Sequence, residues 1–572
     1  MPDVNGNFFS LAPSSTCDCN VIMAKKLPSA YAHPYVIDPR FKKSVAYFSM
    51  EFAIDQALKT YSGGLGFLAG SHMKSAHDLR QNLIGIGILW KHGYYDQVRA
   101  TDNSMVPQFR EKMYSFLKDT GIRFQITIAY QPVWVAAYFL DPKLFGTVPM
   151  FFLTTDTDGN EPWARQISYH LYDSDAAVKV MQCMLLGIGG AKFLDEIGYE
   201  PDVYHLNDAH AVSSVYYLYK KLGKKESVKR RLVFTTHTPE EAGNEKHDIH
   251  FLESLSFFAG VPLHSVRKIT GIGPHDTIFS HSLAALRLSH QANAVSKLHG
   301  EVSRRMWSAA GDICEITHVT NSQHKTSWVD VELEKARVKS DLDGLENRKK
   351  ELKRELFKTV ADQVGKLFDP NILTIVWARR FAAYKRPELL TRDRERFDRL
   401  MRNKDFPIQF IWAGKPYPKD EGAIYTFNQL FYLSHLYPNM AVLTGYELAL
   451  SKELKQGSDV WLNTPIVPRE ASGTSGMTAA MNASLNFSTY DGWVCEFSRH
   501  GENSFIVPVA SESARDWEDM SNMLDVLENE ILPLYYERPN DWQEMVLRSM
   551  NEVGGFFNSD RMAAEYYEKV YK

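Results

Sequence analysis

The amino-acid sequence predicts an α/β protein with two large domains built on parallel sheets. Short apolar segments of strand type alternate along the chain with segments of helical pattern, an order typical of parallel sheets. A chain of 572 residues is long enough for two domains that each bury a core. The composition, 44% hydrophobic and 23% charged, is that of an ordinary globular protein. We therefore expect two α/β domains.

The composition also excludes several classes of partner. A net charge of −4 provides no basic surface for nucleic acid. The most apolar long stretch, residues 178–194, is interrupted by charged residues and glycines and predicts a buried helix, with no membrane partner. The first residues lack the pattern of a signal peptide, and five scattered cysteines suggest neither a disulfide framework nor a metal site. We expect a cytoplasmic protein without a metal, and the sequence leaves homo-oligomer formation open.

The first predicted elements surround a glycine-rich run. After an irregular lead-in up to about residue 43, residues 45–48 predict a buried strand, and a helix is expected over 71–81. Between them, Gly63 and Gly64 belong to the run Tyr-Ser-Gly-Gly-Leu-Gly. Glycines before a helix leave backbone N–H groups uncovered for an anion. A tight turn that allows close helix packing explains such a run equally well.

Two later strands of the first half each end in polar residues that include a histidine. Strand patterns at 202–206 and 232–235 lead into Asp208 and His237, respectively. Ligands gather at the carboxyl ends of strands in open α/β sheets. A single histidine after a strand is usually structural, but two such strand ends favour a site. Helical patterns are expected to continue to residue 305, and residues 316–321, ending in Asn321, to close the first domain.

A cluster of cations opens the second half. The charged stretch 330–368 predicts solvated helices, and the strand at 373–378 then leads into Arg-Arg-Phe-Ala-Ala-Tyr-Lys-Arg. Arg380 and Lys385 in this run combine the two modes of phosphate recognition by cations, although surface charge explains the run as well. Further strands are expected at 410–415 and 441–444, and helices at 513–532 and 541–572.

A turn of small residues follows the next strand, 459–463. Gly473, Thr474 and Ser475 come directly before a helical pattern, where backbone N–H groups are free to bind an anion. Such a turn is also common loop chemistry. The acidic Glu470 at the same turn is suited to orient sugar hydroxyls. A phosphate site next to such a carboxylate suggests a phosphorylated sugar as ligand.

The run Glu-Ala-Ser-Gly-Thr-Ser-Gly-Met from Glu470 resembles the signature of the α-glucan phosphorylases, especially their short bacterial branch. Matching segments extend from about residue 45 to beyond 496. The resemblance implies the GT-B fold, with Rossmann-like domains at 1–320 and 321–540 facing a central cleft, and a segment 541–572 that returns to the first domain. The loop after Asn321 departs from the family, since Ser322 and Gln323 replace its usual Gly-Val.

The resemblance also implies roles for single residues. Gly63, Gly64, Arg380 and Lys385 would hold the substrate phosphate. The amides of Gly473, Thr474 and Ser475 would hold a second phosphate, which the family's pyridoxal phosphate supplies. On the sugar side, the roles implied are the His237 carbonyl over the reacting carbon, Glu470 on the hydroxyls, Asn321 on the 6-hydroxyl and Asp208 in the wall.

Thr478 stands where the family has the lysine that binds pyridoxal phosphate as a Schiff base. A hydroxyl forms no imine, so we expect no covalent cofactor. Two adjacent phosphate sites also suit a sugar nucleotide. The chain resembles the retaining bacterial glycogen synthases, which use such donors, in having an Arg and a Lys five positions apart. The sequence thus predicts a retaining α-glycosyltransferase that transfers from a sugar nucleotide or sugar phosphate donor to a saccharide acceptor. The alternatives are an α-glucan phosphorylase releasing glucose 1-phosphate and an inactive glucan-binding or regulatory protein.

Overall fold

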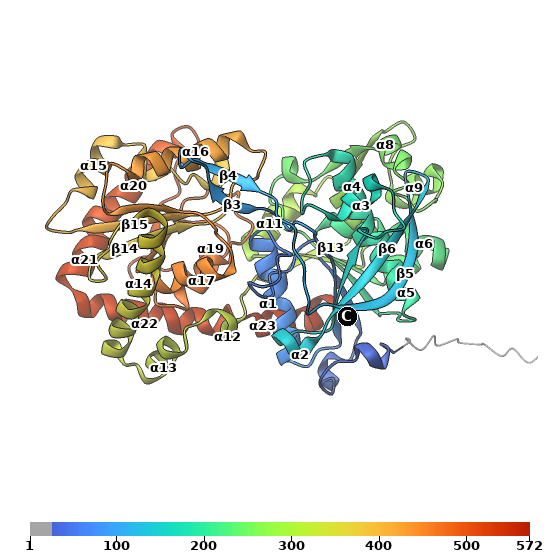
Figure 1. Ribbon diagram of the computed structural model, residues 1–572, viewed down its shortest axis with the longest axis horizontal. Coiled ribbons are helices and arrows are strands. Elements are labelled where there is room, and N and C mark those ends of the chain that lie inside the picture. The colour runs from blue at the N-terminus through green and yellow to red at the C-terminus, as the bar shows by residue number, and fades with distance from the viewer. Residues whose placement is uncertain (1–25) are drawn as a thin grey trace, which may run out of the picture.

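The structure, a computed structural model, describes residues 26–572, so the start of the predicted lead-in lies outside the described residues. Two lobes lie side by side, each built around its own sheet (Figure 1). The chain forms the first sheet before residue 320 and the second after residue 370. The prediction of two α/β domains is confirmed.

The first domain is built on a nine-stranded mixed sheet. Its strands are β1 (Val45–Phe48), β2 (Leu83–Ile88), β5 (Lys118–Ile128), β6 (Gln131–Leu140), β7 (Met150–Thr154), β8 (Val203–Asn207), β9 (Leu232–Thr235), β12 (Gln291–Ala294) and β13 (Glu315–His318). Their order is β13-β12-β9-β8-β1-β2-β7-β6-β5, parallel from β13 to β7. Every residue of β1, β2, β7, β8 and β9 is buried, because helices cover both faces of the sheet.

Two parts of this sheet differ from the prediction. β5 and β6 form an antiparallel hairpin at one edge, where only parallel strands were expected. β12 lies inside the segment for which helix was predicted, so that prediction was wrong. β12 has only four residues, two of them alanine, and it pairs on both sides with β9 and β13. So short a strand of small residues carries no period-2 signal, and its sheet neighbours decide its conformation.

Helices of the first domain connect and cover these strands. They are α1 (Gly64–Asp78), α2 (Pro142–Phe145), α3 (Pro162–Arg165), α4 (Ala176–Met184), α5 (Gly190–Glu196), α6 (Ser214–Leu222), α7 (Lys225–Lys229), α8 (Ile249–Ser254), α9 (Leu263–Thr270), α10 (His281–Leu288), α11 (Lys297–Met306) and α12 (Lys325–Trp328). A π-turn joins α4 and α5 into one helix, which is apolar and long enough to cross a membrane. Its apolar window is 72% buried inside the protein, as predicted for a core helix.

Helix α1 begins seven residues earlier than predicted, inside the glycine run. Within the helix, Gly70 lies so close to the chain after β1 that a Cβ at this position would be 2.0 Å from the carbonyl oxygen of Ala53. The glycines therefore let the helix pack directly against the chain that follows β1. Close helix packing was one of the two explanations of the glycine run, and it accounts for the glycine in the second half of the run.

The second domain is built on a six-stranded sheet in which every strand is parallel. Its strands are β14 (Leu373–Ala378), β15 (Ile408–Ala413), β16 (Met440–Leu443), β17 (Val460–Asn463), β18 (Leu485–Thr489) and β19 (Ser504–Val507), in the order β16-β15-β14-β17-β18-β19. Its helices are α13 (Val331–Lys339), α14 (Leu342–Val364), α15 (Arg394–Met401), α16 (Glu421–Ser434), α17 (Leu448–Gly457), α18 (Ser475–Ala480), α19 (Val494–Phe497), α20 (Arg515–Val526), α21 (Leu532–Glu537), α22 (Pro539–Phe556) and α23 (Ser559–Glu565).

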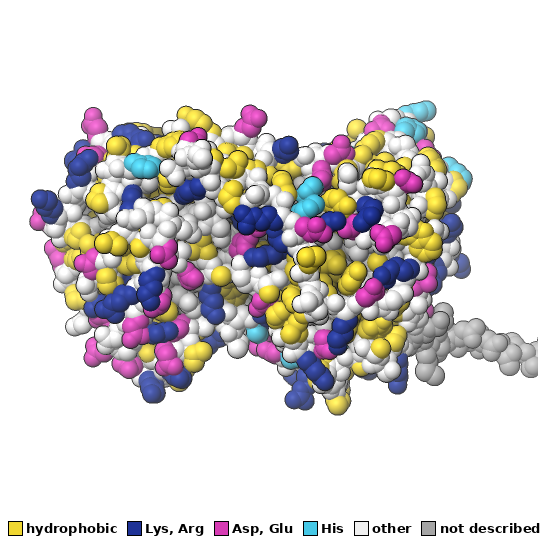
Figure 2. All heavy atoms as spheres, viewed as in Figure 1, with side chains coloured by type: hydrophobic (Ala, Val, Ile, Leu, Met, Phe, Trp, Pro, Cys, Tyr) yellow, Lys and Arg dark blue, Asp and Glu magenta, His cyan; other side chains and the backbone are white. Residues whose placement is uncertain are grey.

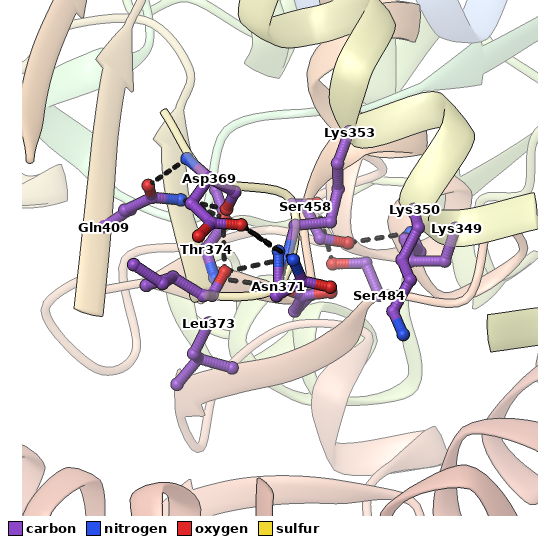
Figure 3. Close-up of polar contacts among 12 residues, drawn as sticks. Lys349, Lys350, Lys353, Asp369, Asn371, Leu373, Thr374, Gln409, Ser458 and Ser484 are labelled. Atoms are coloured by element: carbon purple, nitrogen blue, oxygen red, sulfur yellow. Dashed lines mark hydrogen bonds and ion pairs between the residues drawn. The ribbon is translucent and has the colours of Figure 1, made fainter. Parts of the chain in front are cut away.

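Two buried lysines on α14 hold the helices beside the cleft in place (Figure 3). Lys349 donates to the carbonyl oxygens of Gln456, Ser458 and Asn482, at the C-terminal ends of α17 and α18. Cations are favourable there because helix carbonyls at this end carry partial negative charge. Lys353, one turn further along α14, pairs with the buried carboxylate of Asp459. The charged stretch 330–368 is therefore not solvated throughout, because two of its lysines anchor the site.

Two segments cross between the domains. The hairpin β3 (Asp96–Arg99) and β4 (Met105–Gln108) leaves the first domain and lies beside α16 of the second (Figure 1). There the Gln97 side chain donates to the Gly414 carbonyl and accepts from the Gly445 amide. In the opposite direction, α23 packs on α1 of the first domain, with Ser75 donating to Asp560. The predicted helix 541–572 is therefore two helices, because α22, its first part, packs on α13, α14 and α18 of the second domain.

Candidate active site

A cleft of about 940 Å³ lies between the domains and is lined from both sides. On the face in Figure 2, Lys and Arg side chains gather with acidic and His side chains where the lobes meet. All of the site residues predicted from the sequence line this one cleft: Gly63, Gly64, Asp208, His237, Asn321, Arg380, Lys385, Glu470, Gly473, Thr474 and Ser475. Segments that follow six different strands, β1, β8, β9, β13, β14 and β17, are thereby brought together.

Glu470 is the centre of the charged side of the cleft. Its Oε2 accepts a 2.6 Å hydrogen bond from Lys385 and lies 3.4 Å from Arg379. Its backbone N–H donates to Asp491, which fixes the chain at this point. Burial alone would raise the pKa of Glu470, but the charges of Lys385 and Arg379 outweigh it and lower the pKa below its ordinary value. The carboxylate is therefore ionised at neutral pH.

Arg379 belongs to the site although the sequence analysis passed over it. Its guanidinium, nine-tenths buried, bonds to Asn463 and approaches the Ser475 hydroxyl at 3.4 Å. Its Nε has no hydrogen-bond partner among the described residues. A signal was present, because Arg379 is the first residue after β14 and so stands at the carboxyl end of a central strand.

Arg380 is different from its neighbour because it is exposed and makes no hydrogen bond or ion pair with any residue in the range 26–572. Its side chain lies on the cleft wall. An arginine without a partner keeps all its donors for a ligand, and the planar guanidinium matches phosphate oxygens two at a time. Arg380 is the cation in this cleft that is best able to receive an anion without breaking an existing contact.

The small-residue turn lies opposite these cations. Gly473 adopts a φ of +76°, a conformation that glycine reaches without strain. The following helix, α18, begins at Ser475, whose hydroxyl accepts from the Trp461 ring N–H at 3.3 Å. The turn therefore approaches the guanidinium of Arg379 through the Ser475 hydroxyl.

Thr478 offers no amine to which the aldehyde of pyridoxal phosphate could attach. Thr478 is fully buried, and its hydroxyl donates to the Ser475 carbonyl at 3.0 Å. An imine needs a free amine, and the lysines of the described chain that line the cleft are all in ion pairs. These pairs are Lys179 with Glu245, Lys246 with Glu241, Lys385 with Glu470 and Lys415 with Glu447.

The first domain supplies polar groups that are suited to a sugar. The Oδ1 atom of Asn321 is buried and has no hydrogen-bond partner among the described residues, so it is free to accept from a hydroxyl. The His237 ring bonds to Asn207 at 2.7 Å, and burial lowers its pKa to about 4, so the ring is neutral. Asp208 holds a positive φ of 69°, a strained backbone state that is concentrated at functional sites.

The glycine loop has a partner that the sequence did not reveal. The N–H of Gly63 donates to the buried carboxylate of Glu51 at 3.1 Å. The role predicted for this amide would require Glu51 to release it. Elsewhere in residues 26–572, one group of His and carboxylate atoms is close enough to share a metal ion, formed by Asp78, His324 and Asp560, and it lies outside the cleft lining.

Fold and site together define a class. Two α/β domains face a cleft lined by arginines, lysines, a buried carboxylate and a turn of small residues, and this is the GT-B arrangement of glycosyl-transferring enzymes. Residues 300–522 match the model of the carbohydrate phosphorylase family, and residues 94–306 match that of the starch synthase catalytic domain.

Similar proteins agree with this class. The chain is 45% identical to an uncharacterized protein of Methanocaldococcus jannaschii over 93% of its own length and 100% of that protein. It is 32% identical to the maltodextrin phosphorylase of Thermococcus litoralis, covering 93% of this chain and 71% of that enzyme. It is 31% identical to the glycogen phosphorylase of Mycobacterium tuberculosis, covering 92% of this chain and 70% of that enzyme. The chain belongs to the carbohydrate phosphorylase family.

Proposed function

We propose that this protein is a retaining α-glycosyltransferase that moves a glucosyl unit from a sugar nucleotide to a saccharide acceptor without covalent pyridoxal phosphate. One observation carries the proposal. Arg379 and Lys385 contact Glu470 beside the turn at 473–475, and Arg380 lines the same cleft, whose described lysines are all paired. A donor that brings both of its phosphates suits this cleft better than an aldehyde cofactor that needs a free amine.

The cations would bind the donor diphosphate and stabilise it as it leaves. Arg380 receives the phosphate nearest the sugar, and Lys385 turns from Glu470 to the same oxygens. Arg379 and the turn face the second phosphate. As the bond from C1 to the phosphate oxygen breaks, the diphosphate takes the electron pair, and the cations already bound to it stabilise its charge.

The sugar would be held by groups of both domains. Glu470, ionised at neutral pH, accepts from hydroxyls of the sugar, and the free Oδ1 of Asn321 accepts from another. The His237 carbonyl, to which no described residue donates, stabilises positive charge developing at C1. The acceptor hydroxyl attacks C1 from the face that the phosphate leaves and gives its proton to the departing phosphate oxygen. The product therefore keeps the α configuration.

An α-glucan phosphorylase is the second candidate, and the names of the relatives favour it. Two enzymes named phosphorylases match over nine-tenths of this chain. In that case the anion site takes inorganic phosphate, and the reaction releases glucose 1-phosphate. An inactive glucan-binding protein is less consistent with the site, because the paired charges around Glu470 are costly to bury without a function.

Calorimetry with a set of donors tests the proposal. UDP-, ADP- and GDP-glucose are titrated into the protein, with glucose 1-phosphate as the comparison. We expect one sugar nucleotide to bind at least about tenfold more tightly than glucose 1-phosphate, because it fills both anion positions. Tighter binding of glucose 1-phosphate would favour the phosphorylase. As part of the proposal we place the enzyme in the cytoplasm, where its described cysteines, Cys183, Cys314 and Cys495, stay unpaired.

A further inference from the structure

Glu51 is a buried acid of the cleft wall whose side chain accepts hydrogen bonds from the glycine loop and from Tyr172. It follows β1 by three residues and is 3% exposed. Its Oε2 accepts from the backbone N–H of Ser62 at 2.6 Å and of Gly63 at 3.1 Å. The Ser62 hydroxyl reaches both oxygens at 3.1 Å, and the Tyr172 hydroxyl donates to Oε1 at 2.9 Å.

These contacts fix the charge of Glu51. Four donors converge on its two oxygens, the arrangement that suits a carboxylate, which only accepts hydrogen bonds. No lysine, arginine or histidine of the described chain forms an ion pair with it. Its favourable electrostatics come from the two loop amides and from the N-terminus of α1, which begins at Gly64 and runs for 15 residues. The anion at this helix N-terminus is already part of the protein.

Glu51 also limits the shape of the loop. A Cβ at Gly66 would lie 2.7 Å from its Oε2, so the first turn of α1 is packed directly on the carboxylate. At Gly63 and Gly64, by contrast, a Cβ would meet nothing within 4 Å, because these two residues face the open cleft. The loop is therefore held from behind by Glu51 and presents its outer surface to the ligand.

We propose that Glu51 is a positioning residue that sets the glycine loop for glycosyl transfer and keeps phosphate off the Gly63 amide. This inference rests on the proposed function for its kinetic part. A phosphate at that amide would place a second negative charge beside a buried, unpaired one, where the repulsion is weakly screened. The donor phosphates are thereby kept from the Gly63 amide and directed to Arg380, Lys385 and the turn at 473–475.

Two variants and a matched control test the inference in the full-length protein. Glu51→Gln keeps the size but removes the charge and puts an NH₂ group against an amide donor. Tyr172→Phe removes one donor and no charge. Asp55→Asn makes the same charge change four residues further along, at a residue that does not line the cleft. Hydrogen exchange of the peptide containing Ser62 and Gly63 reports the loop, and calorimetry with inorganic pyrophosphate reports the anion site.

We expect exchange at Ser62 and Gly63 to accelerate by about tenfold or more in Glu51→Gln, less in Tyr172→Phe, and not in Asp55→Asn. Pyrophosphate should bind about tenfold more tightly to Glu51→Gln than to wild type, because a nearby like charge is gone. In transfer assays the same variant should show a lower KM for the donor together with a lower kcat. A loss of structure alone would not tighten anion binding.

Exchange in Glu51→Gln that matches wild type would overturn the positioning role, and pyrophosphate binding that is unchanged or weaker would overturn the exclusion of phosphate. Equal effects in Asp55→Asn would overturn both. If wild type transfers no sugar from any donor, the proposed function fails, whereas the exchange and pyrophosphate results still decide the role of Glu51. The two failures are therefore distinguishable.

Discussion

The ammonium group of Lys385 lies 2.6 Å from Oε2 of Glu470, so the cation expected on phosphate and the carboxylate expected on sugar are each other's partner. Both side chains are nearly nine-tenths buried. A donor phosphate must compete with Glu470 for Lys385, and it releases the carboxylate for the sugar as it does so. Arrival of the phosphate and positioning of the sugar are thereby linked through one ion pair.

The cations of the cleft should contribute to catalysis in different ways. Replacing Arg380 by Ala removes a side chain without protein partners, so transition-state stabilisation should fall by about 2–5 kcal/mol while folding is unaffected. Lys385→Ala should lose a similar amount and also raise the pKa of Glu470, because its main counter-charge is gone. Steady-state kinetics and thermal melting measure both effects. Arg399→Ala, on the exposed side of α15, is the control. Wild-type turnover in Arg380→Ala would assign this residue to ordinary surface charge.

Glu470→Gln tests the sugar side. The amide keeps the size of the side chain and one acceptor but loses the negative charge. In the wild type this charge strengthens the hydrogen bonds that Glu470 accepts from sugar hydroxyls as C1 flattens. We expect kcat to fall by ~10–1,000-fold, the range for one lost electrostatic contact in a dry site. Donor affinity should change much less, because Lys385 is then released to the phosphate. An affinity loss that accounts for the whole defect would mean that Glu470 acts in ground-state binding only.

The protein as purified should contain no pyridoxal phosphate. Thr478 has no amine, and each described lysine lining the cleft is engaged in an ion pair. Absorbance spectra and borohydride reduction followed by peptide mapping check this. A stoichiometric reduced adduct on any lysine would contradict it. Thr478→Lys should bind the cofactor only in part, because Thr478 is fully enclosed and a longer side chain must displace its neighbours.

Buried histidines should make the protein sensitive to acid. Burial lowers the pKa of His72 and of His281 to about 3, whereas both titrate near 6.5 in an unfolded chain. Below pH 6.5 these histidines bind protons in the unfolded state but stay neutral in the folded state. The stability is therefore complete above pH 6.5 and is lost, at about 1.4 kcal/mol per group and pH unit, as the pH falls toward the folded values.

Thermal melting between pH 7.5 and 4.5 measures this loss. His72→Phe keeps the ring stacked on Tyr566 but removes the titrating group, so its Tm should fall less steeply with acid than that of wild type. The Nε2 of His72 has no partner to lose. A Tm that is flat from pH 7.5 to 4.5, or equal slopes for wild type and variant, would contradict the assignment.

The sequence was sufficient to predict the two domains and the residues that meet in the cleft. Strand ends are recognisable locally, and parallel strands place their carboxyl ends at one edge of their sheet, so Arg380 and Glu470 were expected together. That His237 of the other sheet meets them was implied only by the resemblance to the α-glucan phosphorylases. β12 could not be predicted because four small residues take their conformation from the strands on each side. The antiparallel β5–β6 pair likewise depends on which strand is at the edge of the sheet.

Pairings between distant residues were also beyond the sequence. Glu51 is eleven residues from Ser62, and no spacing rule connects an acid after one strand with the amides before the next helix. Arg379 was overlooked because adjacent cations in a run look alike, although one is buried beside Ser475 and the next is exposed. Such neighbours are distinguished by their burial and by their hydrogen-bond partners, and both are properties of the folded chain.

The most direct test of the account is a product assay with two sets of substrates. Wild-type protein is incubated with maltooligosaccharide and UDP-, ADP- or GDP-glucose, and in parallel with maltooligosaccharide and inorganic phosphate, while NMR follows the anomeric signals. The account predicts a new α-glucosidic linkage from one sugar nucleotide, free nucleoside diphosphate in equal amount, and no glucose 1-phosphate. Release of glucose 1-phosphate from the glucan, with no transfer from any nucleotide donor, would contradict it and identify a phosphorylase.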